Sequence, residues 1–169
     1  METKIPFYNL LNMFLTGLIF TGCCVILFSH QVVAFIDTEF FKSISKINVG
    51  LETVITISFF AVIYEIGFII NRIGSLMENL LKKIKAIPFD DDYKKFNEKE
   101  KQFPDKMKML SREYTLSRTS MTLFLILMII SLTQFFWVFS IVMTILTLIF
   151  YFSMRKHSGK IVKMMEDTK

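Results

Sequence analysis

The feature that most constrains the fold of this sequence is a run of 36 residues without a charged side chain, residues 119–154. One straight helix of that length would measure about 54 Å, whereas the hydrocarbon core of a bilayer is about 30 Å thick. Two spans joined by a tight turn fit that thickness better. We expect the turn at residues 131–134, with the aromatic residues 135–137 forming a belt at the membrane interface.

Two earlier runs are also long enough to cross a bilayer. Residues 7–36 contain no Asp, Glu, Lys or Arg, which predicts a first span at about residues 8–30. Residues 53–71 contain one charge, Glu65, and form the second span. With 53% hydrophobic residues, the chain is also too apolar for a soluble domain of this size. The sequence therefore predicts an all-α membrane protein with four transmembrane helices.

The distribution of Lys and Arg predicts the orientation. Segment 72–118 contains twelve of these residues and segment 155–169 contains five, whereas segment 37–50 contains two. If segment 72–118 and both tails are cytoplasmic, 18 of the 20 Lys and Arg residues lie inside. This distribution agrees with the excess of positive charge in cytoplasmic loops, so we expect both termini in the cytoplasm.

The middle segment, residues 72–118, is expected to be a cytoplasmic helical hairpin. Its first helix should end before Pro88, and its second should begin at Pro104 and continue through Arg118 into the third span. The first helix has an apolar stripe of Ile73, Leu76, Met77, Leu80, Leu81 and Ile84. After the turn, a looser stripe is interrupted at Pro104 and consists of Tyr93, Phe96, Phe103, Met107, Leu110 and Tyr114. Spans two and three should thus extend into an antiparallel pair of helices, the stalk, that buries both stripes against each other or against other subunits.

The expected organisation has four parts. Residues 1–71 contain the first two spans and a short outer loop, and residues 72–118 form the cytoplasmic hairpin. Residues 119–154 form a transmembrane hairpin, and residues 155–169 form a basic cytoplasmic tail.

Glu65 is the main candidate functional residue. It lies seven residues before Arg72, or about 10 Å deeper than the cytoplasmic boundary. A carboxylate facing lipid there would cost about 2.5 kcal/mol or more, so Glu65 should face other helices or water. Three interpretations compete: a hydrogen bond or ion pair within the chain, a cation path lined by several subunits, and a proton-carrier site in a small exporter.

The partners considered for Glu65 within the chain are Tyr64, Ser58, Thr122, Arg72 and Arg118. The candidate pore or intramembrane polar set is Glu65, Tyr64, Asn71, Arg72 and Arg118. Arg72 and Arg118 are expected at the same level, where they would flank a shared acidic or phosphate group. Gly67 and Gly74 lie on one helix face, where they would allow a second helix to approach closely.

Nothing in the sequence favours catalysis. His30 and His157 are expected on opposite sides of the membrane, and the chain has no Gly-rich phosphate loop, zinc-ligand spacing or nucleophile elbow. Cys23 and Cys24 are adjacent within a span and should only contribute to packing. We therefore expect no enzymatic activity, no cofactor and no metal.

Basic residues beside the spans are expected to contact anionic lipid headgroups, above all in the stretch SMRKHSGKIVK of residues 153–163. A nucleotide or a partner protein is the alternative ligand. The candidate residues for such a ligand are Lys82, Lys83, Lys85, Arg112, Arg155 and Lys156.

Two stretches, YEIGFIINRIGSL at residues 64–76 and LSREYTLSRT at residues 110–119, resemble small bacterial membrane effectors of anti-phage defence. The transmembrane partner of the Hailong system belongs to this group. The resemblance covers about residues 64–120 and departs from the pattern at Asn79 and Ser117. The matching residues are Tyr64, Gly67, Asn71, Arg72, Gly74, Ser75, Leu110, Ser111, Arg118 and Thr119.

This resemblance implies a toxic, pore-like or channel-like effector in the bacterial inner membrane. It would work as a homo-oligomer, for which we take a tetramer as the working expectation. A cytoplasmic nucleotidyltransferase, or its oligonucleotide product, would gate it. The alternatives are a small proton-coupled exporter that uses Glu65 and a membrane anchor for a cytoplasmic enzyme.

Overall fold

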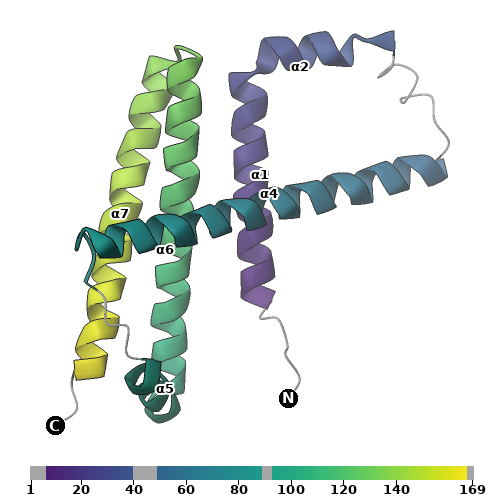
Figure 1. Cartoon of the computed structure of the whole chain (residues 1–169). Coiled ribbons are helices and arrows are strands. Elements are labelled where there is room, and N and C mark those ends of the chain that lie inside the picture. Colours follow the sequence, from purple (N-terminus) through teal and green to yellow (C-terminus); the bar gives the residue numbers. More distant parts are fainter. Residues whose placement is uncertain (1–6, 40–48, 89–92, 167–169) are drawn as a thin grey trace.

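The computed structural model of the protein describes residues 7–39, 49–88 and 93–166. Its elements are the helices α1 (Phe7–Leu27), α2 (Ser29–Ile36), α4 (Val49–Lys83), α5 (Tyr93–Gln102), α6 (Pro104–Thr133) and α7 (Trp137–Glu166). The predicted all-α class is confirmed. The start of α1 and the end of α7 lie at the same end of the molecule (Figure 1).

Four helices are long and apolar enough to cross a membrane: α1, α4, α6 and α7. This confirms four candidate spans and supports a multi-pass membrane protein. The helices continue beyond the apolar runs that predicted them. In particular, α4 begins before the expected second span and ends twelve residues after it, and α7 extends through the basic stretch to Glu166.

Helices α6 and α7 form an antiparallel hairpin, and its turn, residues 134–136, begins at the last residue of the stretch where the sequence predicted it. The N–H groups of Phe135 and Phe136 donate to the carbonyl oxygens of Leu132 and Ser131 and close the end of α6. Further along the pair, the hydroxyl groups of Ser117 and Ser153 share a hydrogen bond of 2.8 Å. The hairpin is therefore paired well beyond its apolar half.

Helix α4 runs across the upright helices α1, α6 and α7 instead of alongside them (Figure 1). At the crossing with α1 the two backbones touch. A Cβ atom added to Gly17 would overlap the carbonyl oxygen of Ile63, and one added to Gly67 would overlap the carbonyl oxygen of Met13. The close approach expected at Gly67 is thus present, with Gly17 as the unforeseen partner.

The predicted stalk is not formed by α4 and α6 in the described residues. Helix α4 contacts α6 over a short stretch in which Asn71 and Glu78 meet Arg118. The N-terminal half of α6 instead pairs with the C-terminal half of α7, where Glu113 Oε2 lies 2.9 Å from His157 Nδ1. The long helical pair therefore comprises spans three and four, because α4 crosses the bundle at a steep angle (Figure 1).

The first apolar stripe, in residues 73–84, is only partly buried within the chain, where Met77 and Leu81 pack against the cluster around Ile87 and Tyr114. Leu76, Leu80 and Ile84 are 66%, 61% and 71% exposed, whereas Glu78 is only 7% exposed. The prediction assumed water around this helix, and water drives apolar side chains inward. In contact with lipid, an apolar face can point outward and the polar face can pack against protein.

The second apolar stripe behaves as predicted on α6. Met107, Leu110 and Tyr114 are buried, although Phe103 is half exposed. Helix α6 begins at Pro104 with Asp105 in its first turn, which confirms the predicted start.

Helix α4 ends before Pro88, as the sequence predicted. The N–H of Ala86 donates to the carbonyl oxygen of Leu81 (2.9 Å), and the N–H of Lys85 donates to that of Lys82 (3.0 Å). Lys85 has φ of 55°, the left-handed conformation that this type of helix end requires. The chain then leaves the axis of α4 and reaches the α6–α7 hairpin, where Ile87 is buried.

Candidate functional site

A buried polar cluster joins α4 to α6. The Arg118 guanidinium donates through Nη1 to Glu78 Oε2 (2.6 Å) and through Nη2 to Asn71 Oδ1 (3.0 Å). The Thr119 hydroxyl donates to the same Asn71 oxygen at 2.9 Å. On the other side of Glu78, Lys82 Nζ lies 2.6 Å from Oε1. We call these five residues the Arg118 cluster.

The sequence of α4 places this cluster on one helix face. Asn71, Gly74, Glu78 and Lys82 follow at intervals of three or four residues, which is one stripe of a helix. Gly74 leaves the space that α6 needs, because a Cβ atom there would lie 3.0 Å from Thr122 Oγ1 and 3.6 Å from Arg118 Cγ. The close approach expected at Gly74 is thus also present, and it brings the Arg118 side chain within reach of α4.

The contacts of the Arg118 cluster indicate a structural role, which is to hold α4 against α6. Thr119 is fully buried, and the side chains of Glu78 and Arg118 are 10% and 14% exposed. Charges at such sites are tolerated only when they are paired and hydrogen-bonded. Each charged group here has an opposite charge as its partner, so the cluster fixes the position of α4 against α6.

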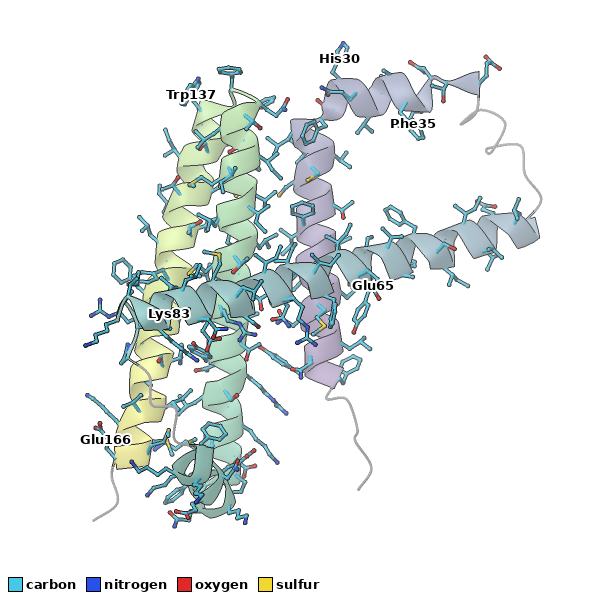
Figure 2. All side chains as sticks on the ribbon, in the orientation of Figure 1. His30, Phe35, Glu65, Lys83, Trp137 and Glu166 are labelled. Atoms are coloured by element: carbon cyan, nitrogen blue, oxygen red, sulfur yellow. The ribbon has the colours of Figure 1, made fainter. Side chains whose placement is uncertain are left out.

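Glu65 lies outside this cluster. It is exposed, on α4 beside the crossing with α1 (Figure 2), and no described residue forms a hydrogen bond or an ion pair with its carboxylate. Two of the partners considered for it are used elsewhere: the Thr122 hydroxyl donates to the carbonyl oxygen of Arg118, and Arg118 pairs with Glu78. The single chain therefore leaves this carboxylate available to another subunit or to water.

Arg72 and Tyr64 do not join a common site with Arg118. The Arg72 guanidinium lies 4.7 Å from the ring centroid of Phe68, one turn earlier on the same helix. The Tyr64 side chain is half-buried. The expectation that Arg72 and Arg118 flank one acidic group is not met, because Glu78 pairs with Arg118, and Arg72 is exposed.

The six basic residues considered as ligand-binding residues lie in separate places. Lys82 belongs to the Arg118 cluster, and Lys83 and Lys85 are exposed at the end of α4. The Arg112 guanidinium lies 5.5 Å from the ring centroid of Tyr8 and connects α6 to α1. Arg155 and Lys156 line a groove on α7.

The described residues show no group of three or more His, Cys, Asp or Glu side chains that could hold a metal. Cys23 and Cys24 are half-buried free thiols in α1, packed against the cluster around Leu123 and Leu127. This agrees with the expected packing role.

Sequence reasoning missed Glu78 and Gly17. Glu78 was not among the candidate residues, although the series Gly67, Asn71, Gly74, Glu78 has intervals of four, three and four residues. A stripe of small and polar residues on an otherwise apolar helix indicates a buried face in a membrane protein. Gly17 follows Asn12 and Thr16, two polar residues of α1 that are also buried, so a similar signal was present there.

Several residues that carry the sequence resemblance meet where α4 packs against α1 and α6. These are Gly67, Asn71, Gly74, Arg118 and Thr119. Comparisons of the chain with protein-family models, curated proteins and solved structures gave no match. The functional proposal therefore rests on the geometry of these helices and on the sequence resemblance.

Proposed function

We propose that the protein is a homo-oligomeric, pore-like or channel-like membrane effector in which Glu65 of each subunit faces a water-filled path. The supporting observation is the exposed carboxylate of Glu65 on an apolar helix. Facing lipid, this group would cost about 2.5 kcal/mol or more. Rings of such carboxylates are a common way to conduct cations through a membrane.

The N-terminal part of α4 supports association with further subunits. Residues 50–62 are all exposed, including Val54, Ile57 and Phe59. This part extends away from the other helices of the chain (Figure 1). Neighbouring copies around a rotation axis would cover it and turn Glu65 away from lipid.

The described residues of one chain leave no conducting path between α4, α6 and α7. Ile70, Leu123, Leu127 and Met143 form a buried apolar cluster where these helices meet. Interiors of this kind are packed too closely for a water column. A conducting form would therefore be built between subunits, and a tetramer is our working assembly.

We further propose that both termini are cytoplasmic, in the inner membrane of a bacterium, and that an infection signal controls the assembly. The signal would be a partner nucleotidyltransferase or its oligonucleotide product. The resemblance to anti-phage effectors supports this role. The Arg118 cluster supplies a physical route, because it links the helix that carries Glu65 to the α6–α7 hairpin.

Reconstitution into liposomes tests the proposal. Purified protein would be compared with Glu65→Gln and with the matched control Glu52→Gln, which removes one carboxylate from the first turn of the same helix. We expect stepwise currents whose cation-to-anion permeability ratio falls in Glu65→Gln and is unchanged in Glu52→Gln. Identical currents in all three proteins would contradict a role for Glu65 in the path.

Cross-linking in membranes tests the assembly separately. A ladder of products that stops at one size is expected for a closed oligomer. If cross-linking gave only the monomer, the proposal of an oligomeric pore would be wrong. Transport driven by a proton gradient, without stepwise currents and abolished in Glu65→Gln, would instead support the exporter.

A further inference from the structure

A basic groove lies on α7 just beyond the apolar part of that helix. Its volume is about 510 Å³, and Pro88 forms the wall opposite α7. The α7 residues that line it are Phe152, Arg155, Lys156, Gly159, Lys160 and Lys163. Their spacing of three and four residues places them on a single helix face.

Charge and shape in this groove favour an anion. Four of its lining residues are Lys or Arg, and none of its described lining residues is acidic. Gly159 leaves room at the centre, because a Cβ atom added there would have Pro88 Cγ as its only neighbour within 4 Å, at 3.7 Å. A phosphate group could therefore approach the backbone of α7 between the basic side chains.

The wall of the groove is fixed by three contacts that do not involve the lysines. The Ser158 hydroxyl donates to the carbonyl oxygen of Pro88. The Tyr151 hydroxyl donates to the carbonyl oxygen of Ala86 at 3.1 Å. Between them, Ile87 is 3% exposed and packs in a cluster with Tyr114, Met121 and Met154. The groove is thus a built feature between two parts of the chain.

The position of the groove favours an amphipathic ligand. The charge-free run ends at Met154, so the groove begins in apolar sequence and ends in basic sequence. Phe152, which is 60% exposed, forms the apolar end, and Lys163 lies three turns further along α7. An acyl chain would contact the first and a phosphate headgroup the second.

We propose that this groove is a binding site for the phosphate headgroup of an anionic phospholipid. Basic clusters just outside a span attract anionic lipid, and here Pro88 and Gly159 give the cluster a defined shape. A bound headgroup would also contact the chain that follows α4, so anionic lipid would stabilise the attachment of that chain to α7. The proposal is independent of pore formation.

Native mass spectrometry of the detergent-solubilised full chain tests the site. The probes are phosphatidylglycerol, phosphatidylcholine and AMP as a soluble phosphomonoester. The charge variant is Lys156→Gln/Lys160→Gln, and its matched control is Lys101→Gln/Lys106→Gln, which removes two exposed charges elsewhere. Gly159→Leu fills the groove without changing charge and replaces Gly by a better helix former.

We expect phosphatidylglycerol to bind more tightly than phosphatidylcholine. The charge variant should weaken that binding by up to about thirtyfold, since it removes two lysines and each lysine near an anionic lipid surface contributes about 1 kcal/mol. Gly159→Leu should weaken it to a similar degree, and the control should bind as the wild type does. Equal binding of phosphatidylglycerol by wild type and Gly159→Leu would contradict binding in the groove, because general charge attraction would then explain the affinity. Tighter binding of AMP than of phosphatidylglycerol would contradict the proposal that the ligand is a lipid.

Discussion

Arg118 on α6 donates a hydrogen bond of 2.6 Å to Glu78 on α4, although the two residues are 40 positions apart in the chain. This contact brings two charges together at a site that is largely closed to solvent. Because a helix with an exposed apolar stripe has few specific contacts, the charge pair determines which face of α4 meets α6.

Removing one partner of this pair should destabilise the protein strongly. Arg118→Met leaves Glu78 with Lys82 alone, and we expect a loss of about 3 kcal/mol in the free energy of unfolding. The double variant Glu78→Met/Arg118→Met should lose less than the sum of the two single variants, because neither charge is then left unpaired. Unfolding in mixed detergent micelles measures these differences.

The exposed Glu98→Gln on α5 is the control and should be neutral. Additive losses in the double variant would show that Glu78 and Arg118 do not interact in solution.

A larger residue at Gly17 should separate α1 from α4. Gly17→Val places a side chain where the carbonyl oxygen of Ile63 lies, so the crossing must open. We expect destabilisation of at least about 1–3 kcal/mol, as in other overpacked contacts. The measurement is the distance between spin labels at the exposed residues Leu18 and Val62.

Gly22→Val is the matched control for this variant, because a Cβ atom at Gly22 has nothing within 4 Å. Label distances that stay unchanged in Gly17→Val would contradict the backbone contact.

Glycine at Lys85 should stabilise the end of α4. Lys85 has φ of 55°, which costs a residue with a Cβ atom about 1 kcal/mol more than it costs glycine. Lys85→Gly should therefore raise the midpoint of thermal unfolding. The same change at Lys83, the last residue of α4, should lower it, because glycine there weakens the helix. A lower midpoint for Lys85→Gly would mean that this helix end has another conformation.

The exposed apolar side chains in the second half of α4 should contact lipid. In a Cys23→Ser/Cys24→Ser background, a cysteine at Leu80 should react slowly with a membrane-impermeant maleimide, and a cysteine at Asn79 should react rapidly. Both positions are exposed in the chain, so only the surrounding solvent distinguishes them. Equal, rapid labelling of both cysteines would place this half of α4 in water, which is what the predicted cytoplasmic stalk implies.

Composition and charge spacing were sufficient to predict the four long helices, the approximate position of the α6–α7 turn and the helix boundaries at Pro88 and Pro104, but not the short helices α2 and α5. These features depend on local chemistry: apolar length, missing N–H groups and restricted φ. The direction of α4 was not predictable in that way. It depends on Gly17 meeting Gly67, two residues 50 positions apart, and on the pairing of Glu78 with Arg118.

The candidate site was predicted only in part. Asn71 and Arg118 were selected and lie together, but Glu78, which pairs with Arg118, was not among the candidates. The reason is the solvent that was assumed to surround this part of α4. The same pattern of apolar and polar residues specifies opposite buried faces in water and in lipid, and the sequence was interpreted as if this part of α4 stood in water.

The crossing of α1 and α4 provides a pivot near the middle of α4. Gly67 lies close to the midpoint of this helix, and the backbones of α1 and α4 touch there, whereas the Arg118 cluster holds the second half of α4 against α6. A rigid helix that tilts about its middle moves its two ends in opposite directions by similar amounts. If the contacts of the Arg118 cluster were broken, a displacement of the Lys83 end would therefore move the Val49 end in the opposite direction by a similar amount.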